Sequence, residues 1–172
     1  MFAETSEVAE RLLSQYGLVA LFVVFVIEGA MLLYFAPSES LVPTAVWLAD
    51  RGAQGTPWPS VAAIIAVSVV GATVGQYALF SLAKRGGREY LLEKSWFRIS
   101  EEKLERFDGW FDRWGPVVVP VSNALLFTRG MLTVPAGFAE MDDREFVALS
   151  ALGTLIFETA LAAITLGIIG WL

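Results

Sequence analysis

Four long stretches with almost no charged side chains constrain this chain more than any other feature. Residues 57–83 contain no charge, and residues 16–35, 114–139 and 146–172 contain one each: Glu28, Arg129 and Glu158. The hydrocarbon core of a bilayer is about 30 Å thick and is crossed by about 20 helical residues, so each stretch is long enough to cross it. The sequence therefore predicts an all-α polytopic membrane protein.

The residue types that the chain lacks exclude several kinds of chemistry. It contains no cysteine and no histidine, so thiolate ligands, imidazole ligands and histidine bases are not available. We therefore expect no metal and no cofactor. The formal net charge of −6 also argues against a nucleic-acid partner.

Two of the stretches are predicted to be uninterrupted transmembrane helices, at 60–83 and 146–172. The first carries Gly71 and Gly75 four residues apart, a spacing that lets another helix approach closely, and we expect both glycines to serve helix packing. The linker between the two halves, 84–113, holds eight of the twelve Lys and Arg residues. The positive-inside rule places this loop in the cytoplasm, and the protein in the cell membrane as a multi-pass chain.

The linker contains a predicted amphipathic helix, "ISEEKLERFDGWFDRWG", at residues 99–115. Ser100 is positioned to cap its N-terminus. An apolar face is formed by Leu104, Phe107, Phe111 and Trp114. Such a face suits either the headgroup region of the membrane or packing against other cytoplasmic residues, and the pattern alone leaves both readings open.

Two apolar segments are interrupted by helix breakers close to a charged residue. The segment 31–50 contains Glu39 between Pro37 and Pro43, and the segment 116–139 contains Arg129 between prolines and beside a glycine. Non-helical backbone cannot face lipid, because its polar groups would lack partners. We therefore expect two re-entrant hairpins. Because the single crossing 60–83 separates them, they enter from opposite sides, in the manner of a pseudo-inverted repeat around a transport site.

Charged side chains near the bilayer midplane are costly, and those that occur there commonly bind substrate, carry protons or form ion pairs. Glu39 and Arg129 are the main candidates, and an ion pair that only holds the hairpins together is the structural alternative. Glu28 is expected to face the same cavity and to serve proton coupling with Glu39. For Glu158, a functional role and a simple hydrogen bond between helices are equally compatible with the sequence.

Four motifs in this order resemble the DedA family, the prokaryotic branch of the SNARE-associated, VTT-domain membrane proteins. They are "PSE", "GATVGQYALFSLAKRGGREYL", "FRISEEKLERFDGWFDRWGPVVV" and "TRGMLTVPAGFAEMDDREF". The resemblance covers about residues 28–155 and implies that 1–172 is a single membrane domain. It implies translocation of a lipid, including polyprenyl phosphates, with protons as a coupling ion. It also implies that the family's essential acid is Glu39 and its second arginine is Arg129.

The chain departs from the family pattern ahead of Arg129. In "NALLFTR", Asn123 stands where the family often has a first arginine, and Leu126 stands where it has a proline. A clamp of two arginines is therefore not available at these positions. Asn123 can still donate hydrogen bonds, and we expect it to bind the substrate together with Arg129 and Ser38.

The leading hypothesis is a lipid transporter, a flippase or scramblase that moves a polyprenyl phosphate or a phospholipid with proton coupling. An alternative from another class is a membrane organiser that does not transport and acts as a homo-oligomer, with Gly71 and Gly75 at its interface. A third is an enzyme acting on lipid phosphates, with Asp108 and Asp112 as the acids to consider. We expect a transporter and not an enzyme.

Overall fold

A computed structural model describes residues 17–32, 40–53, 58–93, 100–126 and 128–171. All regular structure in these ranges is helical. The elements are the helix Gly17–Gly29, α2 (Leu41–Ala53), α3 (Trp58–Leu92), α4 (Glu101–Trp114), the 3-10 turn η2 (Gly115–Val117), α5 (Val118–Ala124), α6 (Thr133–Phe138) and α7 (Asp143–Ile169). The predicted all-α class is confirmed.

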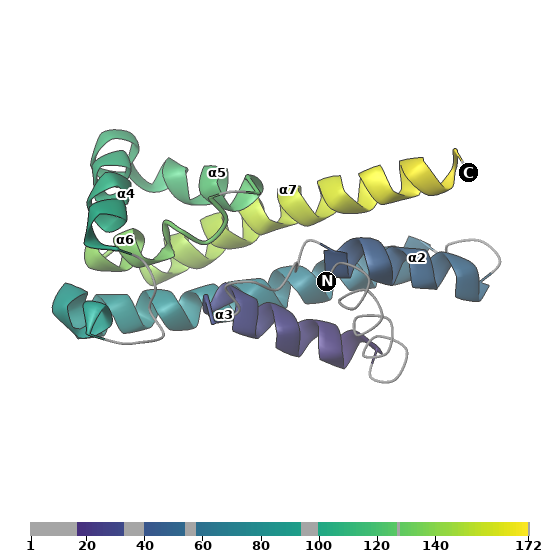
Figure 1. Ribbon diagram of the computed structural model, residues 1–172, viewed down its shortest axis with the longest axis horizontal. Coiled ribbons are helices and arrows are strands. Elements are labelled where there is room, and N and C mark those ends of the chain that lie inside the picture. Colours follow the sequence, from purple (N-terminus) through teal and green to yellow (C-terminus); the bar gives the residue numbers. More distant parts are fainter. Residues whose placement is uncertain (1–16, 33–39, 54–57, 94–99, 127, 172) are drawn as a thin grey trace.

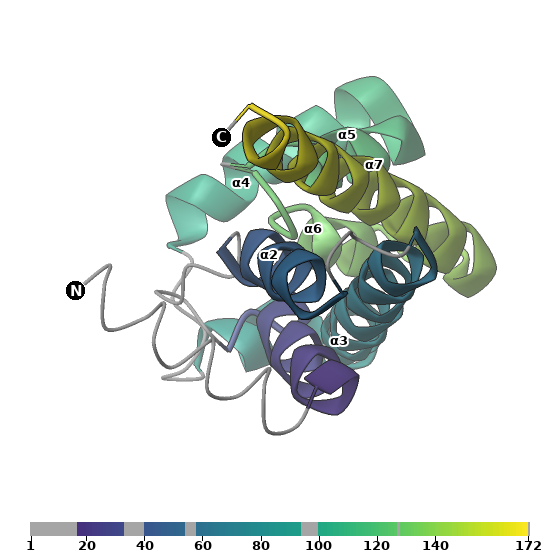
Figure 2. The same cartoon turned by 90° about the vertical axis from the view of Figure 1, so that its right-hand side faces the viewer.

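The two long helices, α3 and α7, run along the molecule and pack against each other (Figure 1). The helices α4, α5 and α6 gather toward one end, and α2 lies toward the other. Seen end-on, the short helix α6 lies near the centre of the bundle (Figure 2). Five of its six residues are buried, so this small element is part of the core.

Among the described residues, two helical segments are long and apolar enough to cross a membrane, at 61–90 and 143–169. They correspond to the predicted crossings 60–83 and 146–172. The first is longer than predicted, because α3 continues through the start of the linker to Leu92 and has non-helical backbone at Gly87. Polar partners hold this extension: Lys84 forms an ion pair with Asp143 of α7, and Arg88 forms one with Asp108 of α4.

Gly71 and Gly75 lie where the helix Gly17–Gly29 approaches α3. A Cβ added at Gly71 would lie 2.8 Å from the carbonyl oxygen of Phe22, and one added at Gly75 would overlap the carbonyl oxygen of Val26. Both glycines therefore pack within one chain. The helix Gly17–Gly29 of the same chain covers the surface around these two glycines. A homo-oligomer would therefore have to form through a different surface.

The amphipathic helix of the linker forms as α4, with Glu101 and Glu102 in its first turn. The predicted side-chain cap is wrong: Ser100 stands at the N-cap position with extended backbone, but its hydroxyl makes no capping hydrogen bond. The apolar face divides in two. Leu104 and Phe107 are buried and Phe111 packs against the core, whereas Trp114 is 64% exposed, so the face packs against the protein except at its end.

The predicted break in the segment 116–139 is present. Seven residues of α5 and six of α6 flank a turn that carries Arg129, and neither helix is long enough to cross a bilayer. The helix α5 packs on α7, and α6 packs on α3. Re-entry of this segment, the repeat relationship and the single-domain boundary stay predictions. Of the other broken segment, 31–50, residues 33–39 lie outside the described residues.

Candidate functional site

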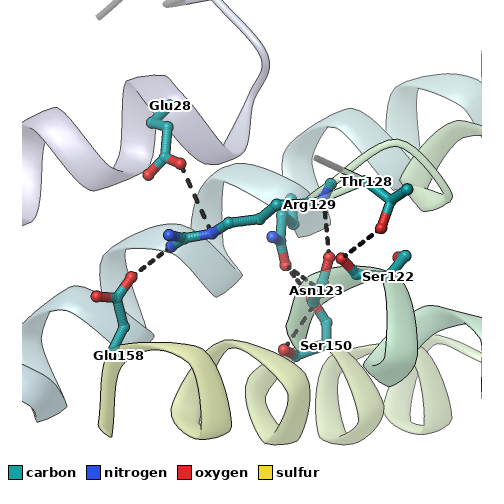
Figure 3. A network of polar contacts seen from close by, with 9 residues as sticks. Glu28, Ser122, Asn123, Thr128, Arg129, Ser150 and Glu158 are labelled. Carbon is teal, nitrogen blue, oxygen red and sulfur yellow. Dashed lines mark hydrogen bonds and ion pairs between the residues drawn. The ribbon is translucent and has the colours of Figure 1, made fainter. Parts of the chain in front are cut away.

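Arg129 lies on the turn between α5 and α6 and points into the protein. The next residue, Gly130, has a φ of 72°, a left-handed conformation that glycine adopts without strain. This conformation reverses the chain sharply after α5. The side chain of Arg129 is only 6% exposed, although it is cationic and comes from a turn. Figure 3 shows that it extends away from Thr128 and toward two glutamates.

Two acids from distant helices hold the guanidinium. Arg129 Nη2 donates a hydrogen bond to Glu158 Oε1 of α7 at 2.6 Å. Glu28, from the helix Gly17–Gly29, places Oε1 3.7 Å from Arg129 Nε. The rings of Phe157 and Phe25 lie 4.6 and 5.6 Å from the guanidinium carbon. The cluster therefore has apolar and aromatic surroundings, in which charge interactions are stronger than in water.

Part of the hydrogen-bonding capacity of Arg129 remains uncommitted. Its Nε and Nη1 atoms are buried and have no hydrogen-bond acceptor among the described residues. A guanidinium presents donors in a planar fork that matches the oxygens of a phosphate or carboxylate. The N–H groups of Nη1 are thus donors of the kind that bind an oxyanion.

Asn123 anchors the turn that carries Arg129. Its Oδ1 accepts a hydrogen bond from the backbone N–H of Gly130 at 2.9 Å. Its Nδ2 donates to Gln76 Oε1 of α3 at 3.2 Å and to Ser150 Oγ of α7 at 3.1 Å, and the Ser150 hydroxyl donates to Gln76. The amide thus joins α3, α5 and α7 beside the turn. Substrate binding by Asn123 stays a prediction, and its observed contacts position Arg129.

An apolar groove of about 480 Å³ lies between α4 and α5, beside the same turn. It reaches Ser122 and Thr128, whereas the guanidinium of Arg129 extends in the other direction (Figure 3). Hydrocarbon side chains and two indole rings form most of its wall. The lining residues are Trp110, Trp114, Val117, Val118, Val121, Ser122, Leu125, Thr128 and Leu132.

The ion pair between Arg88 and Asp108 joins α3 to α4, outside the apolar part of the bundle. Arg88 Nη2 lies 2.9 Å from Asp108 Oδ2. Partial burial raises the pKa of Asp108 above its ordinary value, and the attraction of Arg88 opposes that shift without cancelling it. Neighbouring carboxylates on α4, at Glu105 and Asp112, add to the increase. This pair is a structural link between α3 and α4.

The structure brings together some of the predicted site residues and leaves others untested. Glu28 and Arg129 meet in the ion-pair cluster. Glu39 and Ser38 lie outside the described residues. The role of Glu158 was left open, because the sequence showed only one acid in a 27-residue apolar stretch. Gln76 and Ser150 were missed, because single polar residues in apolar helices are common and their partners depend on the fold.

Comparison with known proteins relates the chain to a family of membrane proteins. The sequence pattern of the VTT domain matches residues 36–167. Undecaprenyl phosphate transporter A of Bacillus subtilis (strain 168) is 27% identical over 126 residues, which are 73% of this chain and 61% of that protein. Undecaprenyl phosphate transporter A of Staphylococcus aureus (strain NCTC 8325 / PS 47) is 21% identical over 160 residues, which are 90% and 75% of the two chains.

A third relative, the uncharacterized membrane protein YbfM of Bacillus subtilis, is 23% identical over 152 residues, which are 88% of this chain and 90% of that protein. This chain thus spans less than two thirds of the length of the Bacillus transporter and most of the length of YbfM. No solved structure matches the chain.

Proposed function

We propose that this chain, which belongs to the VTT-domain (DedA) family of membrane proteins, moves a lipid phosphate across the bilayer. The observation that carries the proposal is the buried guanidinium of Arg129, which retains uncommitted donors among the described residues. A cation held inside an apolar bundle is costly and commonly marks a substrate or ion pathway. Because two relatives bear the name undecaprenyl phosphate transporter, a polyprenyl phosphate is the first substrate to test, and a phospholipid is the second.

Each part of such a lipid has a matching feature in the protein. The phosphate takes the Nη1 edge of Arg129 in a charge-assisted hydrogen bond. The apolar groove between α4 and α5 offers a surface for the hydrocarbon chain near the same turn. We propose that Glu28 and Glu39 supply the proton coupling, because carboxylates inside a membrane bundle are the usual proton carriers.

The proposed topology has α3 and α7 crossing the cell membrane with the linker 84–113 in the cytoplasm. The chain contains no cysteine, so labelling of a single introduced cysteine shows on which side of the membrane that residue lies. In right-side-out vesicles, Arg106→Cys on the exposed face of α4 should react with an impermeant maleimide only after permeabilisation. Labelling of intact vesicles would contradict this orientation.

Translocation of a fluorescent polyprenyl phosphate in proteoliposomes tests the function. Arg129→Lys retains the charge but loses the planar fork, and Arg129→Ala loses both. We expect both variants to reduce the initial rate, Arg129→Ala by about ten- to a hundredfold, which corresponds to one charge-assisted hydrogen bond. Arg106→Ala, which removes an exposed arginine, is the matched control and should retain the wild-type rate.

The lipid supplies a second control. A fluorescent polyprenol without a phosphate should not be moved faster than in protein-free liposomes. A folded Arg129→Ala variant that keeps the wild-type rate, or equal movement of the phosphate and the alcohol, would overturn the proposal.

A further inference from the structure

Two threonine hydroxyls inside the bundle have no hydrogen-bond partner among the described residues. They are Thr73 Oγ1 of α3 and Thr154 Oγ1 of α7. Thr154 is fully buried and Thr73 is 8% exposed. A threonine in a helix can satisfy its hydroxyl with the carbonyl oxygen four residues earlier, as Thr165 of α7 does with Leu161 at 2.8 Å. Neither of the two buried threonines does so, and an unpaired buried hydroxyl is unfavourable for folding.

Thr154 lies between the two residues of α7 that contact the turn and its arginine. Ser150, one turn earlier, bonds Asn123, which anchors the turn. Glu158, one turn later, accepts a hydrogen bond from Arg129 Nη2. The three residues of α7 are four apart, so they share one face of the helix over about 12 Å. The arginine side chain extends from the turn toward Glu158 (Figure 3), and it therefore passes along the part of α7 that carries Thr154.

The register between α3 and α7 brings Thr73 to the same level. The two helices run antiparallel (Figure 1). Two contacts one turn apart fix their register, Phe80 with Phe146 and Gln76 with Ser150. The next turn of each helix carries Thr73 and Thr154. The helix that bears Glu28 packs on this turn of α3, since a Cβ added at Gly29 would overlap the carbonyl oxygen of Ala72. Both hydroxyls are therefore expected beside the ion-pair cluster.

A phosphate bound at Arg129 needs more donors than one edge of the guanidinium provides. A phosphate monoester presents three terminal oxygens, and each is a strong hydrogen-bond acceptor. Inside an apolar bundle, charged oxygens that lack partners are costly. The guanidinium already interacts with Glu28 and Glu158, and its Nη1 is the terminal nitrogen without an acceptor among the described residues. A hydroxyl supplies a further donor without adding charge to this cluster.

We propose that Thr73 and Thr154 bind the headgroup of the transported lipid, each hydroxyl donating a hydrogen bond to one phosphate oxygen while Nη1 of Arg129 binds another. The headgroup site then extends from the turn to α3 and α7, and a bound phosphate bridges these two long helices. The unpaired hydroxyls make the empty site less stable, and the lipid phosphate supplies their acceptors. This inference rests on the proposed function and adds two substrate-binding residues to it.

The test combines two measurements on the full chain. They are calorimetric titration with farnesyl phosphate in lipid nanodiscs and equilibrium unfolding in mixed detergent micelles without this probe. Valine has the shape of threonine but no hydroxyl. Thr154→Val and Thr73→Val should each bind the probe about ten- to a hundredfold more weakly, because one hydrogen bond to a charged oxygen is lost. Both should unfold at the same or a higher denaturant concentration than the wild type, because each removes a buried hydroxyl that has no partner among the described residues.

Two further variants separate a lost hydrogen bond from a change in packing. Thr154→Ser keeps the hydroxyl and should bind the probe within about threefold of the wild type. Thr165→Val is the matched control, since it lies on the same helix and its hydroxyl donates to the backbone of that helix. It should retain the wild-type affinity.

The outcomes separate this inference from the proposed function. Wild-type affinity in both valine variants would overturn the inference and leave Arg129 as a phosphate ligand, and weak binding by only one of them would overturn the role of the other threonine. Binding by Thr154→Ser as weak as that of Thr154→Val would assign the effect to packing and overturn the role of the hydroxyl.

Stability provides an independent criterion. Valine variants that unfold at a lower denaturant concentration than the wild type, or that do not fold, would show that the hydroxyls stabilise the protein without lipid. That result would also overturn the inference. Failure of the wild type to bind farnesyl phosphate would overturn the proposed function, and this inference with it.

Discussion

Replacing Asn123 by alanine should destabilise the protein and loosen the turn that carries Arg129. In the native protein, Asn123 Oδ1 accepts from the N–H of Gly130 at 2.9 Å, in a buried position. Its removal leaves that N–H without its acceptor, at a cost of about 1–3 kcal/mol. The hydrogen bonds of Nδ2 are also lost, which adds about 1 kcal/mol. Because the Ser150 hydroxyl still donates to Gln76, the remaining pair stays satisfied. The expected total is about 2–4 kcal/mol.

Ser122→Ala is the matched control for this measurement. Ser122 is the preceding residue on α5 and is also buried, but its hydroxyl donates only to Val119 O, within the same helix. Thr128 donates to the backbone oxygen of Ser122, and that contact survives the substitution. We therefore expect Ser122→Ala to cost less than about 1 kcal/mol.

Equilibrium unfolding of both variants in mixed detergent micelles measures the difference in free energy, and lipid translocation measures the effect on the site. Asn123→Ala should reduce both the free energy of unfolding and the transport rate, whereas Ser122→Ala should have only a small effect on the free energy of unfolding. Equal stability of the two variants would refute the reasoning. Such a result would mean that the network around Asn123 does not hold the turn.

Three further substitutions test other parts of the account. Gly75→Leu should destabilise the protein strongly, because its side chain would collide with the helix Gly17–Gly29, while Val74→Leu on the exposed side of α3 should have little effect in the same unfolding assay. Burial raises the pKa of Asp108, so the folded state holds that proton more tightly than the unfolded state. The contribution of Asp108 to stability should therefore decline as pH rises from its ordinary pKa through the raised one, and Asp108→Asn should remove that slope from unfolding measured against pH. Asn123→Arg, which restores the arginine common in the family, should reduce stability and transport, because the position is 1% exposed and has no room for a second buried cation.

The apolar helices could be predicted well from the sequence, and for a physical reason. A stretch of at least 20 residues with no more than one charge has few options besides a helix inside a membrane or a core, and this identified α3 and α7. The glycine spacing in α3 likewise indicated a close helix contact. The exact end of α3 could not be predicted, since its extension to Leu92 depends on ion pairs with residues of α4 and α7.

The candidate site was only partly predictable. A lone arginine in an apolar membrane segment is energetically unfavourable, so its presence indicates a functional or structural role. Arg129 was therefore identified from its position alone. Its partners could not be identified, because Glu28 and Glu158 are each the only charged residue of an apolar stretch, at 16–35 and 146–172, and only the packing brings them to the same guanidinium. The hydrogen bonds of the Asn123 amide to α3, α7 and the turn were not predicted, because they depend on the fold, and substrate contact by Asn123 stays a prediction.

The most direct test of the account is whether a lipid phosphate contacts the guanidinium of Arg129. Solid-state NMR dipolar recoupling between ³¹P of a bound polyprenyl phosphate and ¹⁵N-labelled arginine, with the protein in phospholipid-free bilayers, reports this contact. We expect a phosphorus–nitrogen coupling that disappears in Arg129→Lys and persists in Arg106→Lys. A coupling that survives in a folded Arg129→Lys variant with bound lipid would contradict binding of the phosphate by Arg129.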